Sequence, residues 1–276
     1  NPVKIYNWVR NNIEFVPTWG SIQGADHCLL TKECNAMDTT SLLIALLRTS
    51  GISARYVMGT IKVPIGQVMN WAGGFTDKAS ALNFLSSGGI PITGIISGGQ
   101  VSSAQLEHVW VEAYVDYIPS RGAVHKQGDT WIPLDASFKQ YSFSHGIDFQ
   151  AAVPFDASAF INQVQSSATI NETAGYVSNV DGTYIQTTLT NLQSQAENYL
   201  TTNLPNATVE DLIRGKNIIV QEFPFFSSTV PYLIIVSGNP VSTLPESLRH
   251  GLTFEVTTKA FFGADLTYIA SLPELT

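Results

Sequence analysis

The chain has 276 residues, of which 44% are hydrophobic, and its net charge is -8 because 22 acidic residues outnumber 14 basic ones. This length is enough for one or two domains with a sizeable core. The few Lys and Arg residues form no patch, which argues against a nucleic-acid partner, and no apolar run reaches the roughly 18 residues of a membrane span. The sequence starts and stops inside patterned segments, so we expect a domain of a larger protein.

The first residues predict a helix followed by a loop. Residues 1–13 have apolar positions at helical spacing, with Pro2 in the first turn. Residues 15–27 are rich in loop-forming residues, and Trp19 or Gln23 could donate an N–H to an oxyanion or line a cleft. The alternative is a loop that is simply packed by its aromatic side chain.

Cys28 and Cys34 are the only cysteines, with five residues between them. A loop of this length can close into a disulfide if the backbone folds back. Such a bond favours an oxidising compartment and therefore a secreted, periplasmic or cell-surface protein. Two free thiols are the alternative.

A second helix is predicted from residue 35, where small polar residues run into an apolar face. Asn35 or Asp38 can cap its start, and Gly51 suits the left-handed residue at its end. A short strand over 52–57 follows. A helix start carries partial positive charge that stabilises a thiolate or an oxyanion, so it is a favourable place for a nucleophile. The apolar face consists of Leu42, Leu43, Leu46 and Leu47.

Residues 60–105 fit no simple pattern. They contain a possible helix over 78–85 and glycine pairs at 88–89 and 98–99. The segment connects two predicted strands beside the second helix. One interpretation is a lid or a substrate-recognition flap, and the other is a passive surface elaboration.

Two later strands carry candidate catalytic residues. Residues 107–115 alternate with the period of a strand, so His108, Trp110 and Glu112 share one face, and residues 131–135 end in Asp135. A helix start, a strand His and a strand-end Asp can supply a nucleophile, its general base and the carboxylate that orients the base. Trp110 and Glu112 are expected to shape the strand face, and a lone strand His is otherwise structural.

Residues 34–57, 107–115 and 131–135 together resemble the transglutaminase-like superfamily of bacterial type, whose fold is related to papain-type thiol proteases. The family pattern is Gly-x-Cys at a helix start, a helix ending in Arg, Gly-Ile-Pro-Ala-Arg, His-x-Trp-x-Glu and Trp-x-x-Leu-Asp. The matching residues here are Cys34-Asn35-Ala36-Met37, Arg48, Gly51-Ile52-Ser53-Ala54-Arg55, His108-Val109-Trp110-Val111-Glu112 and Trp131-Ile132-Pro133-Leu134-Asp135.

The resemblance implies an α+β fold in which N-terminal helices pack on an antiparallel sheet in a papain-like core. It also implies a Cys-His-Asp cleft that transfers acyl groups from peptide or glutamine amides. His27, His125, His145 and His250 lack metal-ligand spacing, so we expect neither a metal nor a cofactor.

The chain departs from the family pattern at the nucleophile. The resemblance places the nucleophilic Cys at Ala36, and it places Cys34 where the family usually has Gly. A methyl group cannot attack an amide. The alternatives are natural loss of the nucleophile, an engineered Cys to Ala variant, or a shifted helix start in which Cys34 reacts. Because two residues span about 200° around a helix, the last alternative needs a local rearrangement.

The rest of the chain shows no reactive constellation. Residues 138–159 predict a linker or a covering segment. Helices over 185–204 and 208–213 and strands over 223–237 and 252–271 predict a helical connector and a small β region. We therefore expect a transglutaminase-like domain over residues 1–150 and the connector with its β region over 151–276.

Two functions follow. Ala36 favours a non-catalytic domain that binds a peptide or a protein as part of a larger secreted protein. The alternative is an active thiol transglutaminase or cysteine peptidase whose Cys was changed to Ala or is supplied by Cys34. A structural scaffold without a ligand is a weaker third possibility.

Overall fold

The computed structural model describes residues 1–276 except 125, 145, 147, 207–214, 259–265 and 274–276. The chain divides into two compact units, of which the first contains residues 1–142 and 217–276 and the second contains residues 143–216. This division differs from the single boundary expected at residue 150. The difference arises because residues after 217 pack with the N-terminal core, where Asn7 Nδ2 donates a hydrogen bond to the backbone oxygen of Phe223.

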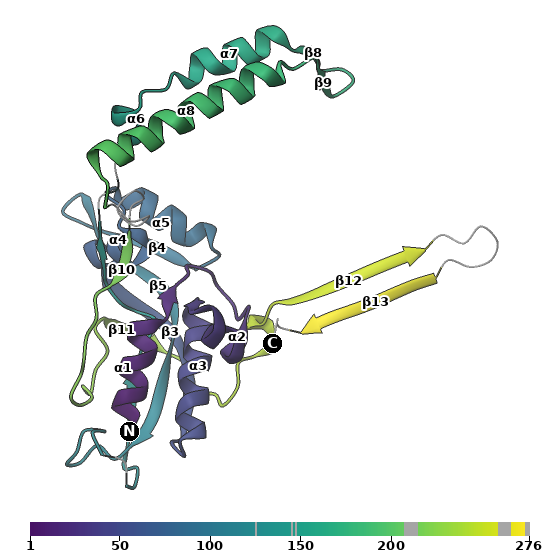
Figure 1. Ribbon diagram of the computed structural model, residues 1–276. Helices are drawn as coiled ribbons and strands as arrows, with labels where there is room; N and C mark the ends of the chain where they lie inside the picture. The colour runs from purple at the N-terminus through teal and green to yellow at the C-terminus, as the bar shows by residue number, and fades with distance from the viewer. Residues whose placement is uncertain (125, 145, 147, 207–214, 259–265, 274–276) are drawn as a thin grey trace. The chain divides into compact units, whose positions relative to one another are not determined.

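The first unit combines helices with a curled antiparallel sheet (Figure 1). Its helices are α1 Pro2–Asn12, α2 Gly24–Thr31, α3 Ala36–Thr49, α4 Ile65–Gly73, α5 Lys78–Ser87 and the short 3-10 helix Glu246–Leu248. Its strands are β1 Glu14–Phe15, β2 Glu33–Cys34, β3 Ala54–Pro64, β4 Ile92–Ser97, β5 Gln100–Val115, β6 Thr130–Leu134, β7 Tyr141–Phe143, β10 Lys216–Ile218, β11 Leu233–Ser237, β12 Gly251–Thr258 and β13 Leu266–Pro273.

The main sheet has the strand order β11-β3-β5-β4, and β6 also pairs with β5. All of these pairings are antiparallel. β4 pairs with the first part of the long strand β5, and β6 pairs with its last part. Pro133 lies in β6, where a missing N–H is tolerated because the strand lies at an edge.

The N-terminal helices have well-defined starts. Asn1 Oδ1 accepts from the backbone N–H groups of Val3 and Lys4 to cap α1. Asn35, one of the two predicted caps of the second helix, accepts from the N–H of Asp38 at the start of α3. Helices α1 and α2 pack against α3, which packs in turn on β3 and β5. The expected fold class, with N-terminal helices packed on an antiparallel sheet, is confirmed.

Residues 60–105 lengthen the two central strands. β3 continues to residue 64 and β5 begins at residue 100, and α4, α5 and β4 lie between them. The predicted helix over 78–85 is observed as α5. Trp71 of α4 is only 1% exposed, so this segment contributes to the core.

The C-terminal part of the first unit contains less strand than expected. The predicted strand over 223–237 is wrong in its first part, because only Leu233–Ser237 forms a strand. Pro224 and Pro231 lack the N–H needed for a sheet ladder, and the side chain of Phe226 is buried in the core. Farther on, β12 and β13 form an antiparallel hairpin.

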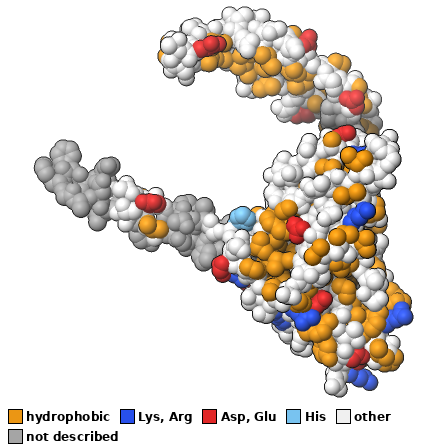
Figure 2. Space-filling view, turned by 180° about the vertical axis from the view of Figure 1, so that it is seen from behind, with side chains coloured by type: hydrophobic (Ala, Val, Ile, Leu, Met, Phe, Trp, Pro, Cys, Tyr) orange, Lys and Arg blue, Asp and Glu red, His pale blue; other side chains and the backbone are white. Residues whose placement is uncertain are grey.

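The second unit is a helical hairpin with a short β turn. It consists of α6 Phe149–Ala152, α7 Ala157–Ser167, β8 Thr169–Asn171, β9 Tyr176–Ser178 and α8 Gly182–Asn203. The helix predicted over 185–204 is observed as α8, whereas α7 and the β8–β9 pair were not predicted. The helix predicted over 208–213 lies outside the described residues. Neither α7 nor α8 contains a buried residue, and Figure 2 shows hydrophobic side chains exposed along this unit.

Candidate active site

His108 lies in the middle of β5, opposite Gly59 of β3. Its neighbourhood is tightly packed, because a Cβ atom at Gly59 would lie 2.1 Å from the backbone oxygen of Val236 in β11. Glycine at position 59 therefore lets β11 approach the sheet beside the histidine. His108 itself is 2% exposed.

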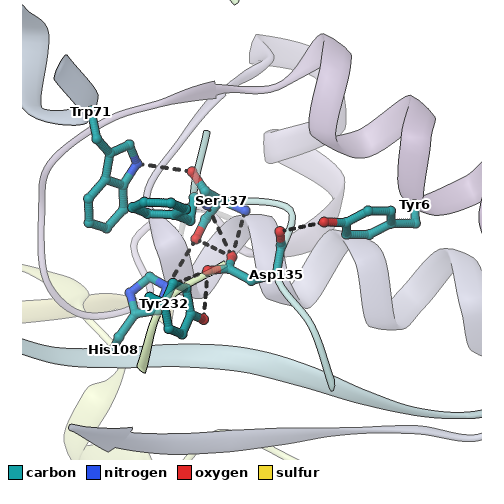
Figure 3. Close-up of polar contacts among 7 residues, drawn as sticks. Tyr6, Trp71, His108, Asp135, Ser137 and Tyr232 are labelled. Atoms are coloured by element: carbon teal, nitrogen blue, oxygen red, sulfur yellow. Dashed lines mark hydrogen bonds and ion pairs between the residues drawn. The ribbon is translucent and has the colours of Figure 1, made fainter. Parts of the chain in front are cut away.

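His108 and Asp135 form a buried hydrogen-bonded pair, which is an ion pair when the imidazole is protonated. His108 Nε2 lies 2.8 Å from Asp135 Oδ2, and the two side chains are 2% and 0% exposed. Asp135 directly follows β6, which pairs with the last part of β5 and so brings the carboxylate to the imidazole. Figure 3 shows the two side chains in contact.

The Asp135 carboxylate accepts several further hydrogen bonds (Figure 3). Oδ1 accepts from the backbone N–H of Ser137 at 2.8 Å, from its hydroxyl at 2.7 Å and from the N–H of Phe138 at 3.1 Å. The Tyr232 hydroxyl donates to Oδ2 at 2.9 Å, and the Tyr6 hydroxyl donates to the backbone oxygen of Asp135 at 3.0 Å. These donors fix the carboxylate and compensate for its burial.

The hydrogen bonds decide the charge state of Asp135. Burial by itself raises the pKa of this carboxyl, but the charge of His108 and the hydrogen bonds from His108, Ser137 and Tyr232 outweigh burial and lower the pKa to about 2. Asp135 is therefore ionised at neutral pH. Burial, followed by the Asp135 charge, raises the pKa of Tyr232 well above its ordinary value, so this phenol stays a donor.

Trp71 forms an aromatic wall beside the ion pair. Its indole Nε1 donates to the backbone oxygen of Ser137 at 3.1 Å, and its ring meets His108 edge-on at a centroid distance of 5.5 Å. The other side of the network lies against β1, because Phe15 stacks on Trp71 at 4.3 Å. Phe15 pairs with Cys34 of β2, directly before α3. Trp71 thus connects the imidazole with the segment that leads into the second predicted helix.

The second ring nitrogen of His108 is unoccupied. Nδ1 makes no hydrogen bond with the described residues, and it lies on the side of the ring away from Asp135 (Figure 3). In a neutral imidazole whose Nε2 carries the proton toward Asp135, Nδ1 is an acceptor. In that tautomer the ring can accept a hydrogen bond or a proton from a group on the Nδ1 side.

The predicted nucleophile position begins a helix. Ala36 is the first residue of α3, directly after its cap Asn35, and it is 7% exposed. Cys34 lies in β2 before the cap, and its sulfur forms a disulfide with Cys28. A nucleophilic role for Cys34 would require this disulfide to open.

The predicted oxyanion and cleft residues have different surroundings. The indole N–H of Trp19 makes no hydrogen bond with the described residues, while its backbone N–H donates to Gly88 of the 60–105 segment at 2.9 Å. The Gln23 amide donates to the backbone oxygen of Glu33 at 2.8 Å, so this side chain joins the start of α2 to β2. Trp110 is 1% exposed and packs near Gly59.

Asp38 holds the loop before α2. Its buried carboxylate accepts from the Ser21 hydroxyl and from the backbone N–H groups of Ile22, Gln23 and Gly24. The predicted alternative, in which Asp38 caps α3 itself, is not observed. Instead, Asp38 links the first turn of α3 to the approach loop and so fixes the position of that loop.

Residues 1–136 match the family model of the transglutaminase-like superfamily. This segment, just under half of the chain, is therefore similar to a transglutaminase-like core. Positions 36, 108 and 135 lie within the matched range. No curated protein and no solved structure shows a significant match to the chain. Within the described residues, no group of His, Cys, Asp and Glu could hold a metal ion, and no helix has the length and apolarity that a membrane span requires.

The sequence analysis missed residues that complete the network around His108 and Asp135. Ser137 had a local signal, because an Asp often accepts from the N–H two residues later in a turn. Trp71 and Tyr232 had none, since neither lies in a motif of the family pattern. Tyr232 lies 97 residues from Asp135 and outside the segment that matches the family.

Proposed function

We propose that the chain is a non-catalytic transglutaminase-like domain that binds a peptide or protein segment beside His108 and works as part of a larger secreted protein. The observation that carries this proposal is the lack of a nucleophile. Position 36 at the start of α3 is Ala, and the disulfide between Cys28 and Cys34 leaves no free thiol.

Two of the residues predicted for the cleft carry groups that suit an extended peptide. His108 Nδ1 can accept a hydrogen bond, and the Trp19 indole N–H can donate one, because neither is used by the described residues. A peptide backbone offers N–H and C=O groups for such partners. The disulfide supports the secreted location, because such bonds persist in oxidising compartments.

The second candidate is an active thiol transglutaminase or cysteine peptidase whose Cys was changed to Ala or is supplied by Cys34. The His108–Asp135 ion pair is buried, and Asp135 accepts hydrogen bonds from Ser137 and Tyr232. Burying an ion pair is costly and is weak evidence for stability alone, which favours a past or present role in proton transfer. A Cys at position 36 would then attack a glutamine amide, release ammonia and leave a thioester for an amine or water to resolve.

Restoring the nucleophile separates these candidates. We expect Ala36→Cys to gain a thiol that iodoacetamide alkylates at least about tenfold faster than the same thiol in Ala36→Cys/His108→Ala, because His108 lowers the barrier to thiolate formation. With a glutamine peptide and hydroxylamine, the single variant should form a hydroxamate and release ammonia. Mass spectrometry should first show one free thiol and an intact Cys28–Cys34 bond.

An Ala36→Cys protein that reacts no faster than the double variant would show that more than one side chain is missing. Binding is tested on the unchanged chain by the anisotropy of fluorescent glutamine-containing peptides, with Trp19→Ala as the cleft variant and Trp8→Ala as the control. Trp8 is 39% exposed on α1. If the unchanged chain binds no peptide, the binding function is wrong and the scaffold alternative stands.

A further inference from the structure

A cavity of about 380 Å³ lies behind the Asp135 backbone, between α1 and the loop 221–231. Its size is within the range of small-molecule sites. Its walls come from four separate parts of the first unit: α1, Gln67 of α4, residues 133–140 and residues 221–231. The lining residues used below are Tyr6, Arg10, Phe138, Lys139, Phe223 and Phe225.

Arg10 is the unusual member of this lining. The residue is 4% exposed, and its guanidinium donates only through Nη1, to Asn11 Oδ1 at 3.1 Å and to the backbone oxygen of Ile219 at 3.2 Å. Its remaining N–H groups have no partner among the described residues, and no described carboxylate forms an ion pair with it. A buried guanidinium without a direct ion-pair partner is costly. Burial lowers the pKa of Arg10 from its ordinary value, although its electrostatic interactions with Tyr6, Asp135 and Tyr141 act in the opposite direction.

Several aromatic side chains contribute to the cavity wall, beside polar and aliphatic ones. Phe223 lies beneath the guanidinium, with its ring centroid 5.9 Å from Arg10 Cζ, and Phe138 and Phe225 also line the space. Lys139 is 1% exposed and donates through Nζ to the backbone oxygen of Ile13. The cavity therefore combines an apolar body with a cationic end.

The cavity adjoins the candidate active site without including its imidazole. Neither His108 nor Trp71 lines it, whereas Asp135 and two of its hydrogen-bond donors, Tyr6 and Phe138, belong to both sites. Tyr6 borders the cavity and donates its hydroxyl to the backbone oxygen of Asp135. A ligand in the cavity would contact Tyr6, which donates to the backbone of Asp135, without reaching the imidazole of His108.

We propose that this cavity is a binding site for a small organic acid, with its carboxylate on the Arg10 guanidinium and its aromatic or aliphatic body against the phenylalanines. A carboxylate matches the planar fork of Arg and supplies the missing counter-charge. The apolar walls provide the remaining free energy of binding through burial of the ligand body.

The test compares two ligands of nearly equal shape on the unchanged chain. Isothermal titration calorimetry gives the dissociation constants of 3-phenylpropionate and of the uncharged 3-phenylpropanamide. Their ratio measures how much the negative charge of the ligand contributes to its affinity. We expect the acid to bind at least about tenfold more tightly, because a charge-assisted hydrogen bond is stronger than a neutral one. Equal affinities, or no binding of the acid at millimolar concentration, would overturn the proposal.

Two variants then test whether Arg10 causes the preference for the acid over the amide. Arg10→Gln should remove the preference for the acid, whereas Lys4→Gln, which removes the same charge from an exposed position of α1, should keep it. Circular dichroism confirms that each variant is folded. If a folded Arg10→Gln protein still prefers the acid, Arg10 is not the anion-binding group and the proposal is wrong; if that variant does not fold, the comparison of the two ligands on the unchanged chain decides.

Discussion

At the scale of single residues, Asp135 shows how a buried charge is supported. Its carboxylate is fully buried, but it faces His108 and accepts hydrogen bonds from Ser137, Phe138 and Tyr232. Hydrogen bonds to the ionised form lower a pKa, while burial raises it. The balance favours the ionised form, so this carboxylate couples the stability of the fold to pH.

Tyr232→Phe tests this support. The variant keeps the ring but removes the hydroxyl that donates to Asp135 Oδ2, so we expect the free energy of unfolding at pH 7 to fall by about 1–3 kcal/mol. The folded pKa of Asp135 lies below its unfolded value, so its stabilising contribution is complete above about pH 4 and is lost as the pH falls toward about 2. Without the Tyr232 hydroxyl, the pKa of Asp135 in the folded state rises toward its unfolded value. The variant should therefore lose less stability between about pH 4 and about pH 2 than the unchanged chain.

Urea titrations at a series of pH values measure both effects. Tyr114→Phe is the matched control, because the Tyr114 hydroxyl makes no hydrogen bond with the described residues. A Tyr232→Phe protein with the stability and pH profile of the control would contradict the role of this hydroxyl.

At the scale of elements, two links position the start of α3. The disulfide joins Cys28 of α2 to Cys34 of β2, and the Asp38 carboxylate holds the loop at Ser21. Both links lie immediately beside position 36, so the helix start is fixed by its neighbours as well as by its Asn35 cap. The element that carries the predicted nucleophile position is therefore held from several sides.

Cys28→Ser/Cys34→Ser measures the contribution of the first link. Cross-linking a loop of this size lowers the entropy of the unfolded chain, so we expect the double variant to lose about 2 kcal/mol of stability. The unchanged chain should lose the same free energy of unfolding when a reductant is added to the urea titration. The reductant should not change the stability of the double variant, which has no disulfide to open. Identical urea midpoints for the oxidised chain and the variant would show that the bond adds no stability.

At the scale of the whole molecule, the two units differ in how much they bury. α3 and β5 of the first unit contain many buried residues, whereas α7 and α8 of the second unit contain none. Helices in water depend mainly on tertiary packing for their stability. The second unit should therefore open more easily than the first.

Hydrogen exchange tests this difference. We expect the amides of α7 and α8 to exchange at least about tenfold faster than those in the middle of α3, because local opening costs less where little apolar surface is buried. Mass spectrometry of peptides from the two units, at two protein concentrations, gives the comparison. Equal protection that persists on dilution would contradict the prediction.

Much of the first unit was predictable because its signals are local. The helix from Asn35, its end near Gly51 and the strand that carries His108 follow from caps and periodicity within a few residues. The contact between His108 and Asp135, which are 27 residues apart, was expected from the order of a helix start, a strand His and a strand-end Asp, and from the family pattern that these residues resemble. The strand expected from residue 223 failed because prolines and buried aromatic side chains overrode an apolar run.

The sequence by itself therefore determined the local elements, the Ala at position 36 and the motifs that predict the family. Only the tertiary structure decided which distant side chains surround the ion pair, that Trp71 packs on the imidazole, and that Tyr232 donates to Asp135. It also decided that residues 217–276 return to the first unit. The physical reason is that caps and periodicity act between near neighbours in the chain, whereas these contacts depend on how whole elements pack.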